Sequence, residues 1–150
     1  MQIETERLLL AACTEESVAE ASLAGYDMRL HIYEHLTALR EDPSLLGWGA
    51  WFVTCKKTGE VIGDIGFKGS PDVKGCVEAG YGIVPTAQGK GFATEAVQAV
   101  IQWAFSSPAV KQIIAECHAE NLASIRVLEK LQMERAASKN GLLKWQLQRK

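Results

Sequence analysis

The chain of 150 residues is long enough for one domain with a substantial buried core. Hydrophobic residues make up 47% and charged residues 23%, which are ordinary proportions for a globular protein. The formal net charge of -2 and the scattered basic residues argue against a nucleic-acid binder that works by bulk attraction. No apolar run approaches the ~20 residues that span a bilayer. We therefore expect a single domain over residues 1–150, with no nucleic-acid or membrane partner.

The start of the chain and its cysteines indicate a cytoplasmic protein. The first seven residues include the carboxylates of Glu4 and Glu6 and lack the apolar segment of a signal peptide. The four cysteines form no C-x-x-C pair, which is typical of free thiols in a reducing cytosol. They are Cys13, Cys55, Cys76 and Cys117. We expect a monomer or a homodimer.

The first half of the chain predicts one strand, two helices and a hairpin. Helices are expected from Thr14 to near Gly25 and over Met28–Arg40, where apolar residues recur near helical spacing. The strand-like runs are Arg7–Ala12, Trp48–Cys55 and Glu60–Lys68. The last two are joined by a polar turn with a late glycine, which indicates a hairpin.

The second half predicts a third strand of this meander, followed by alternating helices and strands. The expected strands are Val77–Val84, Gln112–His118, Met133–Ala136 and Leu142–Gln148, and the expected helices are Ala93–Phe105 and Leu122–Leu131. Asn140-Gly141 is a strong hairpin signal between the last two strands. The strand–helix–strand passage favours a parallel pair within the sheet.

A glycine-rich loop, Gln88-Gly89-Lys90-Gly91-Phe92-Ala93, lies between a predicted strand and a predicted helix. The first turn of a helix has backbone N–H groups without partners, and small residues let an anion approach them. A Walker A loop would need glycine at Val84 and a hydroxyl residue at Gly91, and the dinucleotide fingerprint is not matched either. Taken alone, the loop is either an anion cradle or a simple glycine turn.

Two ordered motifs resemble a known family. Gln88-x-x-Gly91-x-Ala93 is similar to the Q/R-x-x-G-x-G/A signature of the Gcn5-related N-acetyltransferase (GNAT) superfamily, which binds the coenzyme A pyrophosphate. Asn121–Ser124, followed by Val127–Leu131, resembles its second signature, in the branch that contains ribosomal-protein N-terminal acetyltransferases (RimJ/RimL-like). Thr5–Leu10 and Gly141–Trp145 are also similar to that branch, so the resemblance covers nearly the whole chain.

The resemblance implies an α+β fold of three α/β/α layers, with a mixed central sheet of about six to seven strands and a splayed parallel pair. It implies an enzyme that moves an acetyl group from acetyl-CoA to a primary amine, on a peptide N-terminus or a small molecule, by direct transfer in a ternary complex. No metal is expected. The coenzyme-binding residues that it implies are Ile83, Val84, Gln88, Gly89, Lys90, Gly91, Phe92, Ala93, Thr94, Asn121 and Ser124.

The resemblance also points to a general base. Glu78 falls where some family members keep this base, although it could instead order the loop or pair with a basic neighbour. Glu116 and His118 are the runners-up, and they should face the same side of their strand because they alternate with Cys117.

The position at which the family usually has its general acid differs in this sequence. Leu128 occupies the position of the usual tyrosine, so Ser124 is the hydroxyl expected near the sulfur, unless it only caps its helix. Asn121 is similarly open to interpretation as a helix cap, a coenzyme contact, or both. Gln132 stands where the family usually has glycine, in a left-handed position that costs other residues roughly 1 kcal/mol.

His31-Ile32-Tyr33-Glu34-His35 spells H-x-x-E-H, a zinc motif of some metalloproteases, although it could be only a polar helix face. In the family this region forms one wall of the amine-binding cleft, and the residues expected there are Tyr26, Arg29, His31, Tyr33 and Trp48. Three functional classes therefore remain: an N-acetyltransferase, a non-catalytic acetyl-CoA-binding module, and a zinc hydrolase that uses His31, Glu34 and His35.

Overall fold

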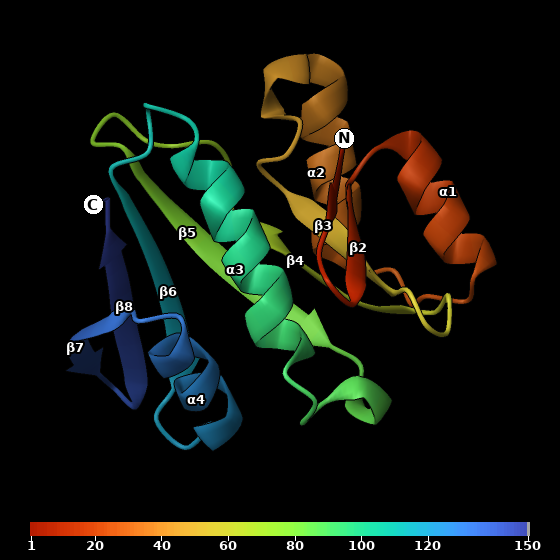
Figure 1. Cartoon of the computed structure of the whole chain (residues 1–150). Coiled ribbons are helices and arrows are strands. Elements are labelled where there is room, and N and C mark those ends of the chain that lie inside the picture. Colours follow the sequence, from red (N-terminus) through yellow and green to blue (C-terminus); the bar gives the residue numbers. More distant parts are fainter. Residues whose placement is uncertain (150) are drawn as a thin grey trace.

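A mixed sheet runs through the part of the chain that the computed structural model describes, residues 1–149 (Figure 1). Its eight strands there lie in the order β1-β2-β3-β4-β5-β6-β8-β7. They are β1 (Gln2–Glu4), β2 (Leu8–Ala12), β3 (Ala50–Cys55), β4 (Val61–Phe67), β5 (Cys76–Ile83), β6 (Gln112–His118), β7 (Glu134–Lys139) and β8 (Leu142–Gln148). Neighbours are antiparallel except β5 and β6, which are parallel.

Helices cover both faces of this sheet (Figure 1). They are α1 (Glu15–Leu23), α2 (Leu30–Glu41), α3 (Phe92–Phe105) and α4 (Leu122–Lys130). Helices α1 and α2 share a core cluster with Phe52, whereas α3 and α4 share the larger cluster with Trp51. Because successive residues of a strand face opposite sides, Trp51 and Phe52 mark the two faces. The predicted three-layer α+β fold is confirmed.

The helix boundaries follow from local signals. Thr14 and Ser17 form a capping box at the start of α1. The Asn121 side chain accepts a hydrogen bond from the Ser124 N–H (3.1 Å) at the start of α4. Helix α3 buries five side chains, including Val97, and each large aliphatic residue of this kind stabilises the fold by about 1.5–3 kcal/mol.

Strands β5 and β6 separate shortly after they begin. Their parallel pairing covers only Cys76–Glu78, whereas β5 remains paired with β4 over Ala79–Ile83. The Val84 N–H donates to the Ile62 carbonyl on the β4 side (2.8 Å). Because backbone groups alternate in direction along a strand, the N–H groups of Tyr81 and Ile83 face the opening toward β6. The predicted splayed parallel pair is confirmed.

Two expectations change in detail. Strand β1 was not predicted, so the sheet has one strand more than the six to seven expected among the described residues. The seventh strand begins at Glu134 and extends to Lys139, beyond the predicted Met133–Ala136. Asn140 and Gly141 form the predicted hairpin turn between β7 and β8, with left-handed backbone at φ of 53° and 77°. Over residues 1–149 no helix is both long and apolar enough to cross a membrane.

Candidate active site

A first cavity of about 510 Å³ opens beside the splay, between the end of β5, the loop before α3 and the helix α4. Its lining includes nine of the eleven residues expected to bind the coenzyme. These are Ile83, Gln88, Gly89, Gly91, Phe92, Ala93, Thr94, Asn121 and Ser124. The structure thus brings the two motifs together, although about thirty residues separate them in the sequence.

The glycine loop leaves this cavity open to an anion. Gly89 and Gly91 have left-handed backbone conformations, with φ of 78° and 81°. Residues other than glycine adopt this conformation only at a cost in free energy. Gly91 is the N-cap of α3 and offers no side chain to its first-turn N–H groups. A Cβ added at Gly89 would meet no atom within 4 Å. On the opposite wall, Arg126 and Lys130 of α4 add positive charge, which suits a pyrophosphate.

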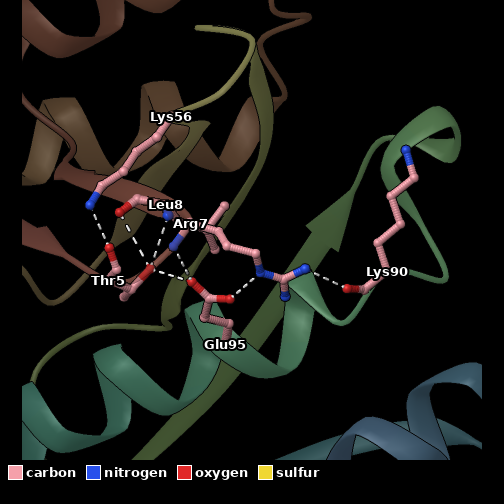
Figure 2. A network of polar contacts seen from close by, with 6 residues as sticks. All are labelled: Thr5, Arg7, Leu8, Lys56, Lys90 and Glu95. Atoms are coloured by element: carbon pink, nitrogen blue, oxygen red, sulfur yellow. Dashed lines mark hydrogen bonds and ion pairs between the residues drawn. The ribbon is translucent and has the colours of Figure 1, made fainter.

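A polar network ties the loop to the N-terminal segment (Figure 2). Arg7 Nε lies 2.6 Å from Glu95 Oε1, and a terminal nitrogen of Arg7 donates to the Lys90 carbonyl (2.8 Å). Thr5 Oγ1 and the Arg7 N–H both donate to Glu95 Oε2 (2.6 and 2.9 Å). Arg7 also covers the Phe92 ring, with 4.4 Å between the guanidinium carbon and the ring centroid. Arg7 thus contacts both ends of the Lys90–Glu95 segment.

These contacts set the ionisation of Glu95. Partial burial opposes its charge, but the hydrogen bonds from Thr5 and Arg7 outweigh burial and lower the pKa of Glu95 below its ordinary value. The carboxylate therefore stays ionised beside the loop at neutral pH.

Two predicted coenzyme contacts are revised. The Val84 N–H is bonded to Ile62, and its carbonyl accepts from the Ala87 N–H (2.9 Å), so both backbone groups of this expected coenzyme contact already have partners. Lys90 does not line the cavity; its carbonyl accepts from Arg7 while its side chain extends away from the guanidinium, as Figure 2 shows. The Ile83 carbonyl accepts from Gln88 Nε2 (2.8 Å), which explains how a glutamine at this position orders the strand end.

The predicted catalytic residues are separated by the fold. Glu78 does not line this cavity, and its carboxylate pairs with Lys68 at 2.6 Å, which matches the alternative that it binds a basic neighbour. Ser124 does line the first cavity, and its N–H is capped by Asn121. Glu116 and His118 are exposed on the face opposite Cys117, as expected, and line neither cavity.

Tyr81 is a site residue that the sequence did not reveal. Its side chain reaches α4, where the hydroxyl lies 3.5 Å from the Ser124 carbonyl. Burial raises the pKa of Tyr81, so the phenol keeps its proton at neutral pH. The alternation of strand β5 could have placed Tyr81 on the same face as Ile83, but its contact with α4 depends on tertiary packing.

A second cavity of about 630 Å³ lies on the α2 side of the sheet and shares Arg29 and Tyr81 with the first. Its wall includes His31, Glu34 and His35 of α2, and its floor includes Asp64, Gly66 and Gly80. Asp64 accepts a hydrogen bond from the Tyr26 hydroxyl (2.5 Å), and its Oδ1 atom lies 2.8 Å from His31 Nε2. Burial and the contact with Asp64 raise the pKa of Tyr26, whereas burial lowers the pKa of His35.

The residues expected in the amine-binding wall divide into two groups. Arg29 and His31 line the second cavity, and Tyr26 supports it through Asp64. Tyr33 is half exposed elsewhere on α2, and Trp48 packs against Trp103 with 4.7 Å between ring centroids. Sequence reasoning missed Asp64, because a lone aspartate in an apolar strand has no motif.

The geometry of the H-x-x-E-H segment differs from a zinc site. His31 Nε2 is bonded to Asp64, and His35 packs against Gly49. Among residues 1–149 there is no group of three or more His, Cys, Asp or Glu side chains that could hold a metal ion.

Comparisons with known proteins agree with this architecture. Residues 5–134 match the family model of the acetyltransferase (GNAT) domain. The chain is 39% identical to the uncharacterized N-acetyltransferase YjdG of Bacillus subtilis over 85 residues, 57% of this chain and 51% of YjdG. It is 29% identical to the uncharacterized N-acetyltransferase YoaA of Bacillus subtilis, over 95% of this chain and 85% of YoaA. The chain thus spans about half the length of YjdG.

The fold is also similar to a solved structure of RimL, a ribosomal L7/L12 alpha-N-protein acetyltransferase, in complex with coenzyme A. The TM-score is 0.74 at 16% identity, and the match covers 99% of this chain and 98% of RimL. Because the family model covers residues 5–134, the chain belongs to the GNAT acetyltransferase family.

Proposed function

We propose that the chain is an acetyl-CoA-dependent N-acetyltransferase that transfers the acetyl group directly to a primary amine in a ternary complex. The observation that carries this proposal is the meeting of two cavities at Arg29 and Tyr81, beside the splayed end of β5. One cavity suits an anionic coenzyme and the other is open on the opposite side of the same strand. When the acetyl donor and the amine are bound together on either side of one strand, the amine can attack the thioester directly, and no covalent enzyme intermediate is needed.

The coenzyme would occupy the first cavity. The first-turn N–H groups of α3 and the charges of Arg126 and Lys130 are suited to its phosphates. The unpaired N–H groups of Tyr81 and Ile83 would pair with an extended amide arm, as an added strand does. The bound coenzyme would supply the thioester carbonyl, and a backbone N–H is suited to stabilise charge that develops on it.

Proton donation to the departing sulfur would come from the start of α4. Ser124 lines the cavity, and the protonated Tyr81 phenol lies beside it. The family usually has a tyrosine at the position of Leu128, which is buried in the core here. A phenol supplied by β5 instead would explain how the enzyme works without that tyrosine. The resemblance implies Glu78 as the base, but its carboxylate pairs with Lys68 and lines neither cavity, so we do not assign it that role.

The acceptor would be a primary amine that enters the second cavity. RimL acts on the N-terminus of a ribosomal protein, as its name states, so a peptide N-terminus is one class to test, and a small-molecule amine is the other. We also infer a cytoplasmic location, because all four cysteines are free thiols.

A panel of peptides and small amines, with free thiol release as the readout, tests this function. We expect turnover with at least one amine and none without an amine. Coenzyme binding without turnover on any amine would favour a non-catalytic binding module instead. Ser124→Ala and Tyr81→Phe should each lower kcat while coenzyme affinity stays within a few fold; unchanged kcat in both would remove the proposed acid.

A further inference from the structure

Asp64 is the one buried charged residue within residues 1–149, with 7% of its surface exposed. A buried carboxylate is costly unless hydrogen bonds compensate it. Here the Tyr26 hydroxyl donates to Oδ2, and His31 Nε2 lies within hydrogen-bond distance of Oδ1. Strand β4, the loop before α2 and α2 itself each contribute one member, so three separate segments converge on this cluster.

The cluster determines which nitrogen of His31 can accept a proton. An ionised carboxylate only accepts hydrogen bonds, so the Nε2 atom facing Asp64 carries the hydrogen. In a neutral imidazole, Nδ1 is then a free acceptor. The His31 side chain is 50% exposed, whereas the side chain of Asp64 alone is 9% exposed. The carboxylate is thus enclosed, and the imidazole that it orients borders the second cavity.

The cavity that His31 borders has glycines in its floor. Asp64 lies opposite Gly82 and Gly66 lies opposite Gly80 in the pairing of β4 with β5. A Cβ added at Gly80 would meet no atom within 4 Å, so the glycines leave space over β5. A ligand there can reach the strand whose opposite side borders the coenzyme cavity. Arg29 spans the same place, with a guanidinium nitrogen 3.5 Å from a Cβ added at Gly82.

We propose that His31 is the general base of the reaction, and that Asp64 and Tyr26 are positioning residues that hold its tautomer. The proposal rests on the proposed acetyltransferase function. Nδ1 takes one proton from the acceptor's ammonium group. The amine nitrogen then forms a bond to the thioester carbon, the carbon–sulfur bond breaks, and the second proton leaves the nitrogen as the sulfur gains one. His31 finally releases its proton to solvent.

Other charged or titratable groups line the same cavity. They are Arg29 at the N-cap of α2, Glu34 and His35 from α2, Lys68 after β4, and Tyr81 from β5. None of them has a hydrogen bond to a buried carboxylate among the described contacts. His31 is the group whose protonation geometry is fixed by a buried partner.

The test compares His31→Ala, Asp64→Asn and Tyr26→Phe with the wild-type protein on an amine that the panel identifies. We expect His31→Ala to lower kcat about 100-fold or more, the scale of general-base catalysis. Asp64→Asn should lower it comparably, because an amide N–H facing Nε2 would shift the hydrogen to Nδ1. Tyr26→Phe should have a smaller effect. Added imidazole should partly restore His31→Ala.

The pH profile separates a base from a structural residue. Wild-type kcat/KM should rise with pH along a limb that His31→Gln lacks. Thr37→Ala, on the exposed side of α2, is the matched control and should keep both the rate and the limb. A coenzyme-induced rise in Tm in each variant shows that it is folded. If His31→Gln keeps the limb and kcat within threefold, the proposal is overturned. Absence of turnover in the wild type would instead overturn the acetyltransferase function.

Discussion

Arg7 and Glu95 lie 88 residues apart in the sequence, yet Arg7 Nε and Glu95 Oε1 are 2.6 Å apart (Figure 2). The same guanidinium donates to the Lys90 carbonyl, and a nitrogen of it lies 3.3 Å from a Cβ added at Gly91. One side chain from the N-terminal segment therefore fixes the loop that would hold the coenzyme phosphates. The loop conformation depends on this contact as well as on its glycines.

Arg7→Ala should weaken coenzyme binding about tenfold. A charge-assisted hydrogen bond contributes about 1.5–3 kcal/mol, and without it part of that free energy would have to be spent on ordering the loop when the coenzyme binds. Isothermal titration with coenzyme A measures the change. Arg40→Ala is the matched control, because Arg40 makes a similar contact with Glu15, remote from both cavities. Equal affinity in the Arg7 and Arg40 variants would contradict this role.

The same contact predicts a loss of stability in acid. The folded-state pKa of Glu95 lies below its unfolded value, near the ordinary 4.5. Its stabilisation is therefore fully present above pH 4.5 and is lost as the pH falls through the lower folded-state pKa. Urea unfolding at several pH values should show a smaller acid-induced loss for Glu95→Gln than for the wild type. Parallel curves for the two proteins would exclude Glu95 as a source of acid sensitivity.

Gln132 is strained in the left-handed region, with φ of 64° after the end of α4. Gln132→Gly should raise the free energy of unfolding by roughly 1 kcal/mol, because glycine adopts this conformation without a Cβ clash. Chemical denaturation measures it. Gln98→Gly, within α3, should have the opposite sign by a similar amount. A destabilised Gln132→Gly variant would show that the side chain compensates its backbone strain.

Local signals predicted much of the fold, including the position of the glycine loop between β5 and α3. The capping box of Thr14, the Asn140-Gly141 turn and the loop at Gly91 each depend on neighbours within a few residues. Strand β1 escaped prediction because three mostly exposed residues carry no periodicity. Asp64 escaped because its partner His31 lies 33 residues away, a distance across which no pattern in one sequence indicates a contact.

Asn121 caps helix α4 beside the first cavity, and substitutions there test how much this cap stabilises the fold. Asn121→Ala should lower the free energy of unfolding by about 0.5–2 kcal/mol, because the Ser124 N–H loses its acceptor. Asn121→Asp should retain most of the stability, since a carboxylate is an equally good cap. Thermal denaturation without coenzyme compares them. Equal losses in both variants would assign the effect to something other than capping.

If the glycine loop and α4 bind acetyl-CoA as proposed, millimolar coenzyme should change the thermal stability of the protein. We expect a clear rise in Tm for the wild type, because a ligand that binds only the folded state stabilises it. Gly91→Glu should remain folded but lose the shift, since a bulky anion would occupy the phosphate position. No shift in the wild type, or an equal shift in Gly91→Glu, would contradict the account.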